Sequence, residues 1–149
     1  MQTAIKKYFI RPIFFCIFAL LIKLEIMTRK TNKEAETEML AKVVATAMSD
    51  KKATDIVMLD LRGVASAPAS FFVICTGNSP LHTDAIADAI HEAVKKTFGI
   101  NPTSTEGYDT AEWILMDYFD VVAHVFVAKT RDFYRLEDLW ADGKRTEIQ

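Results

Sequence analysis

The chain has 149 residues, of which half are hydrophobic and about a quarter are charged. This length suits one folded domain with a sizeable core and is too short for two ordinary domains. The formal net charge of −2 hides a division along the chain: residues 1–30 carry six basic side chains against one acidic, and the remainder carries twelve against nineteen. Because an acidic domain has no basic stripe to neutralise phosphates, we do not expect direct, sequence-specific binding of nucleic acid.

The N-terminal segment differs from the rest of the chain. Residues 13–22 are ten consecutive apolar residues between two basic ones, too few for a hydrocarbon core of about 30 Å, which needs roughly twenty. They resemble the front of a signal peptide but lack a small-x-small cleavage site. Met27 begins a sequence typical of a cytosolic start. We therefore interpret residues 1–26 as an extension upstream of the true start and residues 27–149 as one cytoplasmic domain; a weak membrane anchor is the alternative.

Two helices are indicated early in the domain. Residues 32–49 place apolar side chains at helical spacing behind an acidic first turn, which complements the helix dipole. A second helix is predicted after Ser79, a typical N-cap, with Pro80 at its first position and Gly99 at its end.

Short apolar or alternating runs predict the strands. Residues 56–61 and 71–76 are short enough for buried strands, and 113–117 and 121–127 alternate around a polar turn as a hairpin does. A short extended piece near Pro102 adds a fifth strand, and residues 130–140 are expected to be a helix covering an edge of the sheet. The predicted fold is α/β, with a mixed sheet of about five strands packed with helices.

Residues 101–128 contain five carboxylates and no lysine or arginine. At the centre of this stretch stands Trp113, and tryptophan is a favoured anchor at protein interfaces. On an alternating strand it should share a face with Leu115 and Asp117, opposite Ile114 and Met116. Both a core position and a position facing a basic protein stay open for Trp113.

Catalytic and metal sites have weaker support. Asp60, Asp117 and Asp120 could hold magnesium in a metal-dependent nucleotidyltransferase, but apart from Arg62 this region lacks basic groups for a triphosphate. We interpret Asp117 and Asp120 as turn residues that bond their own backbone. His124 has no second histidine or cysteine at ligand spacing, which favours a hydrogen-bonded, partly buried histidine. No cofactor or metal is predicted.

Several ordered motifs resemble the ribosomal silencing factor (RsfS, or Iojap-like) family from Thr54 to Trp140. They are Asp60-Leu61-Arg62, Phe72-Val73-Ile74-Cys75-Thr76-Gly77-Asn78-Ser79, Ala85-Ile86-Ala87-Asp88, Glu106-Gly107-Tyr108, Ala111-Glu112-Trp113-Ile114-Leu115-Met116-Asp117-Tyr118, Asp120-Val121-Val122-Ala123-His124-Val125-Phe126, and Arg131-Asp132-Phe133-Tyr134-Arg135-Leu136-Glu137-Asp138-Leu139-Trp140.

The resemblance implies a nucleotidyltransferase-like topology without catalytic equipment. It implies a translational repressor, not an enzyme, that binds the basic ribosomal protein L-fourteen on the large ribosomal subunit and blocks joining of the small subunit when nutrients fall. It implies no membrane partner and leaves a homodimer open. The implied partner-binding residues are Glu106, Gly107, Trp113, Asp117, Tyr118, Asp120 and His124.

This chain departs from the family pattern in two places. Ser70 and Phe71 replace the usual Asp-Tyr, which puts a local polar contact in doubt. Phe119 occupies a turn position where glycine is common. It is expected to stiffen the hairpin tip or to add an apolar contact.

Overall fold

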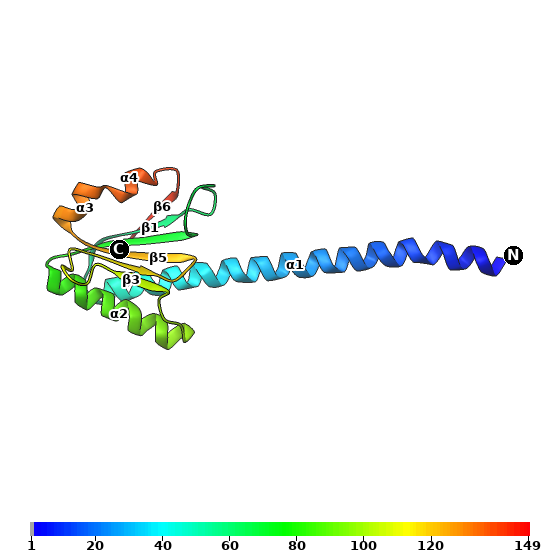
Figure 1. The fold of residues 1–149 in the computed structure, drawn as a ribbon, viewed down its shortest axis with the longest axis horizontal. Helices are drawn as coiled ribbons and strands as arrows, with labels where there is room; N and C mark the ends of the chain where they lie inside the picture. Colours follow the sequence, from blue (N-terminus) through cyan, green and yellow to red (C-terminus); the bar gives the residue numbers. More distant parts are fainter. Residues whose placement is uncertain (1) are drawn as a thin grey trace. The chain divides into compact units, whose positions relative to one another are not determined.

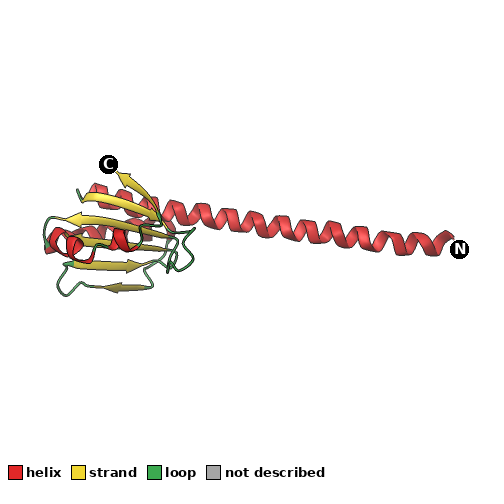
Figure 2. Ribbon diagram, turned by 90° about the horizontal axis from the view of Figure 1, so that it is seen from above, coloured by secondary structure: helices red, strands yellow, loops and turns green. Residues whose placement is uncertain are grey.

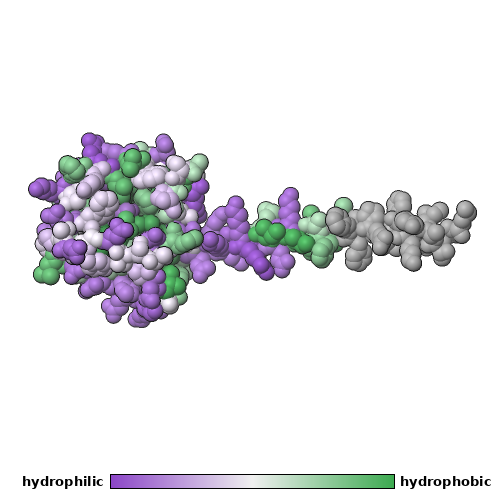
Figure 3. All heavy atoms as spheres, in the orientation of Figure 1, coloured by the Kyte–Doolittle hydropathy of each residue, from purple (hydrophilic) through white to green (hydrophobic). Residues whose placement is uncertain are grey.

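The computed structural model describes the backbone of residues 2–149 and the side chains from Cys16 onward. The chain divides into two compact units, the first reaching to Glu36 and the second spanning Thr37–Gln149. Helix α1, Gln2–Asp50, contributes to both. In the first unit, Figure 3 shows apolar side chains gathered on α1, and those from Ile17 to Met27 are largely exposed. None of the described helices is long and apolar enough to cross a membrane.

The second unit is built on a six-stranded mixed sheet (Figures 1 and 2). Its strands are β1 (Thr54–Asp60), β2 (Phe71–Gly77), β3 (Ser104–Glu106), β4 (Trp113–Asp117), β5 (Val121–Val127) and β6 (Lys144–Ile148). The order across the sheet is β3-β4-β5-β2-β1-β6, and only the central pair, β2 and β5, runs parallel. The predicted α/β fold with a mixed sheet is confirmed, although the sheet has six strands rather than about five.

Strand β6 is the element that the sequence pattern misses. Its residues, Lys-Arg-Thr-Glu-Ile, are mostly charged and exposed, so no alternation of apolar and polar side chains marks them. The strand pairs with β1 along the edge of the sheet. Charged side chains are common on edge strands because they discourage pairing with other chains.

Helices cover both faces of the sheet. One face packs against the end of α1 and against α2 (Pro80–Phe98), as Figure 1 shows. In α1 the buried side chains recur at helical spacing: Leu40, Ala41, Val44, Ala45 and Met48. Helix α2 begins and ends as predicted, since Ser79 accepts a hydrogen bond from the His82 N–H (3.2 Å) and Gly99 closes the helix at φ 71°.

The opposite face of the sheet lies under two short helices, α3 (Ala128–Tyr134) and α4 (Leu136–Leu139). The two are separated by Arg135 in the left-handed conformation, at φ 47°. Leu136 packs among Val57, Leu59 and Phe72 of the sheet. The predicted helix at 130–140 therefore covers a face of the sheet, and its expected position on an edge was wrong.

Candidate functional site

The pairing of β3, β4 and β5 determines which side chains share a face. Trp113, Leu115 and Asp117 are half-buried, and Ile114 and Met116 between them are fully buried in the core on the other side. The predicted orientation of Trp113 is confirmed. Because Glu106 lies opposite Leu115 in the β3–β4 register, it projects from the same face as Trp113. Together, Glu106, Trp113, Leu115 and Asp117 form an acidic–aromatic face of the sheet.

Trp113 lies in a stack of aromatic rings. Its ring centroid is 4.9 Å from that of Phe126, which is buried beneath it, and 4.8 Å from that of Tyr134 in α3. Its indole N–H donates a hydrogen bond of 3.2 Å to Nδ1 of His124. One side of the Trp113 ring therefore packs on the core, and the half-buried side chain keeps part of its surface exposed.

His124, on the neighbouring strand β5, accepts the hydrogen bond that orients Trp113. Only 3% of His124 is exposed, and its ring packs edge-on against Phe72. Burial lowers the pKa of His124 from 6.5 to about 3, since a charged imidazolium would be desolvated here. The neutral ring accepts at Nδ1, which assigns its proton to Nε2. Protonation at Nδ1 would remove the acceptor that holds Trp113.

This buried histidine predicts a pH dependence of folding. Because its folded pKa lies below the unfolded value, the stability it contributes is present above about pH 6.5 and is lost as the pH falls. Between pH 7 and pH 5 we expect it to account for a loss of about 2 kcal/mol in the free energy of unfolding.

Urea unfolding at several pH values measures this dependence. His124→Gln should show a shallower loss of stability with acid than the wild type. His91→Gln is the matched control, because His91 is exposed on α2 and should keep the wild-type slope. Equal slopes for all three proteins would contradict the role assigned to His124.

Gly107 shapes the backbone that leads into β4. Its φ is 89°, and a Cβ added there would lie 1.8 Å from the Trp113 carbonyl oxygen. Its own carbonyl accepts from the Ala111 N–H at 2.9 Å. No other residue type fits this close approach without displacing the strand. Gly107 therefore positions Trp113 through the backbone.

The β4–β5 turn contains the hairpin tip. Asp117 accepts a hydrogen bond of 2.7 Å from the backbone N–H of Phe119 through its carboxylate, as expected of a turn aspartate. The Asp120 carbonyl accepts from the N–H groups of Ser70 and Phe71, at 2.9 and 3.0 Å. Phe119 is 73% exposed and has φ 73°, the left-handed region in which glycine is favoured.

Replacing Phe119 is expected to stabilise the domain. Phe119→Gly removes left-handed strain from a side chain that buries little surface, and we expect a gain of about 0.5–1 kcal/mol in the free energy of unfolding. Phe133→Gly is the control, because Phe133 is equally exposed but lies within helix α3 and should lose about 0.5–1 kcal/mol. A loss of stability in Phe119→Gly, measured by urea unfolding, would contradict the strain argument.

The seven residues implied by the family resemblance are not all at one surface. Glu106, Trp113 and Asp117 share the acidic–aromatic face, and Gly107 borders it. Tyr118 is 4% exposed and packs in the core on the opposite side of the sheet, where burial raises the pKa of its phenol. His124 lies beneath Trp113, and Asp120 belongs to the turn. The structure thus brings three side chains together at one surface.

The aspartates considered for magnesium have other surroundings. Asp60 accepts hydrogen bonds from Arg62 Nε (2.9 Å) and Nη2 (2.5 Å), and this pairing lowers the pKa of Asp60. Within the part of the chain that the structure describes, no three His, Cys, Asp or Glu side chains gather as metal ligands do. The metal-dependent alternative therefore gains no support from the described residues.

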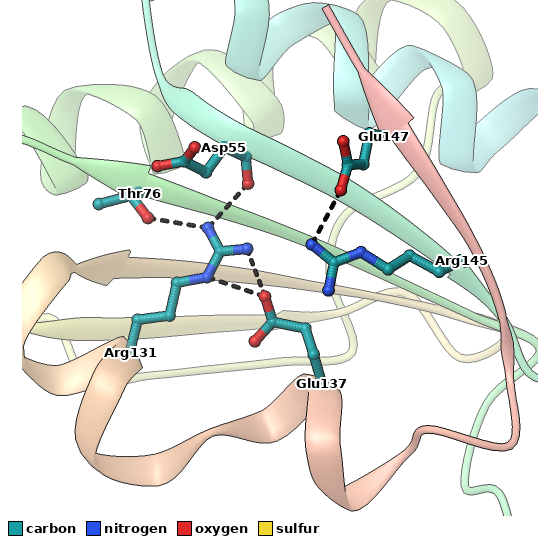
Figure 4. A network of polar contacts seen from close by, with 6 residues as sticks. All are labelled: Asp55, Thr76, Arg131, Glu137, Arg145 and Glu147. Atoms are coloured by element: carbon teal, nitrogen blue, oxygen red, sulfur yellow. Dashed lines mark hydrogen bonds and ion pairs between the residues drawn. The ribbon is translucent and has the colours of Figure 1, made fainter.

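Helix α3 brings residues to the site that sequence reasoning did not assign. Figure 4 shows Arg131, whose guanidinium donates to the Asp55 carbonyl (2.7 Å), to the Thr76 hydroxyl (2.8 Å) and to Glu137 (3.0 Å from Nε). Arg131 and Glu137 are both largely buried. This network fastens α3 and α4 to β1 and β2, and it thereby places Tyr134 against Trp113.

The fold and site define a small α/β domain whose mixed sheet carries an acidic–aromatic face beside a helical cover. A family model described as "Ribosomal silencing factor during starvation" matches residues 33–149. The chain belongs to this ribosomal silencing factor family.

Individual relatives agree with the family. The chain is 41% identical to ribosomal silencing factor RsfS of Bacillus subtilis over 109 residues, which cover 73% of this chain and 91% of that protein. It is 31% identical over 121 residues to the chloroplastic protein Iojap of Arabidopsis thaliana, covering 81% of this chain and 50% of that protein.

Solved structures show the same fold. A crystal structure of a Chromobacterium violaceum protein has a TM-score of 0.66 at 30% identity, over 75% of this chain and 92% of that one. A Bacillus halodurans structure has a TM-score of 0.64 at 37% identity, over 74% and 99%.

Proposed function

We propose that this protein is a cytoplasmic translational repressor that binds the large ribosomal subunit and sterically prevents the small subunit from joining. Membership of the ribosomal silencing factor family supports the ribosomal role. The proposed contact is the basic ribosomal protein L-fourteen, and the proposed occasion is nutrient limitation. The protein is proposed to act by occupying a surface rather than by catalysing a reaction.

One observation carries the proposed contact: Trp113 reaches the surface on the same sheet face as the carboxylates of Glu106 and Asp117. The stretch from residue 101 to 128 contains no lysine or arginine that could neutralise those carboxylates from within. A tryptophan surrounded by acidic groups suits a basic partner, because opposite charges speed encounter and the indole supplies a buried anchor.

Co-sedimentation with purified ribosomal subunits tests this function. The protein should pellet with large subunits and not with small ones, and adding it before subunit mixing should lower the fraction of joined ribosomes. Binding should weaken as salt is raised, because charge attraction at an exposed surface is screened. Failure to pellet with large subunits, or joining at an unchanged level, would contradict the proposal.

Glu106→Gln with Asp117→Asn tests the charge contribution in the same assay. Both carboxylates are replaced by neutral side chains of similar shape. This double variant should bind more weakly and should show a smaller dependence on salt than the wild type. Asp142→Asn is the control, since Asp142 is exposed in the segment between α4 and β6.

A further inference from the structure

Aromatic side chains continue outward from Trp113 along helix α3. The ring of Tyr134 lies 4.8 Å from that of Trp113, and the ring of Phe133 lies 5.0 Å from that of Tyr134. Tyr134 is 53% exposed and Phe133 is 79% exposed. Trp113, Tyr134 and Phe133 therefore form an aromatic row that begins on the sheet and ends on the helix.

The helix that carries this row is held in place. Arg131 stands three residues before Tyr134. It ties α3 to the sheet through Asp55 and Thr76, and it ties α3 to α4 through Glu137 (Figure 4). Leu136 anchors the second helix in the core beneath. Because both ends are fixed, Tyr134 and Phe133 are presented to a partner in a defined position, which lowers the entropy cost of binding.

The charges near the row favour a cation. Arg131 and Arg135 are paired with Glu137 and Asp138, so these four side chains balance one another. Asp132 lies beside the row, next to Phe133 in the chain, and forms no ion pair with any described residue. Glu106 and Asp117 lie on the adjoining face of the sheet. Lys129 on α3 contributes one positive charge to the same neighbourhood. Three carboxylates against one ammonium leave the neighbourhood of the row negative.

Aromatic faces beside carboxylates suit one side chain above others. A guanidinium is planar, stacks on aromatic rings and is weakly hydrated, whereas an ammonium keeps its water more strongly. We propose that the aromatic row extends the docking surface beyond Trp113 and that Tyr134 and Phe133 receive an arginine side chain of the basic partner. This inference rests on the proposed function and adds a residue preference to it.

Affinity for purified large ribosomal subunits tests the extension. Tyr134→Ala should lower the affinity roughly 5- to 30-fold, and Tyr134→Phe, which keeps the ring, should stay within about 3-fold of the wild type. Phe133→Ala provides a second variant that removes a largely exposed side chain and should also weaken binding. Leu139→Ala is the control, because Leu139 is 73% exposed on α4 outside the row and should bind as the wild type does.

Labelled hexa-arginine and hexa-lysine peptides test the residue preference by fluorescence anisotropy. The wild type should bind hexa-arginine more than about 3-fold more tightly, and Tyr134→Ala should lose that preference. Equal binding of the two peptides by the wild type would overturn the arginine assignment. Unchanged affinity of Tyr134→Ala and Phe133→Ala for large subunits, with Trp113→Ala impaired, would overturn the extension alone. Absence of wild-type binding to the subunits would instead overturn the proposed function.

Discussion

Trp113→Ala is expected to lower affinity for the large ribosomal subunit about 30- to 1,000-fold, which corresponds to roughly 2–4 kcal/mol. The physical reason is that the indole would be buried at the centre of an interface while its neighbours exclude water. Its orientation is fixed in advance by the hydrogen bond to His124 and by the rings of Phe126 and Tyr134. Binding therefore requires little further ordering of this side chain.

Loss of packing within the domain must be separated from loss of the contact. Trp140→Ala is the matched control, because Trp140 is also half-buried on this side of the sheet. Its ring packs edge-on against that of Phe72, with the ring centroids 5.8 Å apart. Both variants should lose stability by urea unfolding, and only Trp113→Ala should lose subunit affinity. Trp113→Ala that remains folded and pellets with large subunits as the wild type does would contradict the site.

Local patterns along the chain predict a large part of this fold. The two strands around the polar turn, Trp113–Asp117 and Val121–Val127, have the predicted bounds. The start of α2 at Pro80 and its stop at Gly99 follow from capping preferences that act within a few residues. Such features need no knowledge of distant contacts, so the sequence is sufficient to predict them.

Features that depend on distant contacts are harder to predict. Strand β6 has no apolar alternation and exists because β1 offers it a free edge. The contact between Tyr134 and Trp113 joins residues on two elements and depends on Arg131 reaching across to β1 and β2. No spacing within a short window of sequence indicates that contact.

The burial of Tyr118 could have been predicted from the sequence. If the alternation of β4 is continued, Tyr118 falls on the side of Ile114 and Met116 and away from Trp113, as its place in the core shows. His124 projects from the same face of the sheet as Trp113. It lies on the central strand β5, however, and only 3% of it is exposed. The family resemblance implies Trp113, Tyr118 and His124 alike, and it does not indicate which of these side chains are buried.

Gly107→Ala is expected to destabilise the domain by about 2–4 kcal/mol and to reduce subunit binding with it. An added methyl group would meet the Trp113 carbonyl at 1.8 Å while the backbone is held at φ 89°, so strand β4 would have to move at the residue that anchors the site. The combination of a backbone clash and a left-handed conformation explains why this single methyl group has so large an effect.

Substitutions at Gly99 and Gly63 separate the cost of the left-handed conformation from the cost of the backbone clash. At Gly99 a Cβ would meet nothing within 4 Å but φ is 71°, so Gly99→Ala should lose about 1 kcal/mol through conformation alone. At Gly63 neither strain nor contact opposes a side chain, so Gly63→Ala should be neutral or slightly stabilising. Urea unfolding of the three variants should therefore rank Gly107→Ala well below Gly99→Ala, with Gly63→Ala near the wild type. If Gly107→Ala lost no more stability than Gly99→Ala, the close approach of Gly107 to Trp113 could not be what positions the indole.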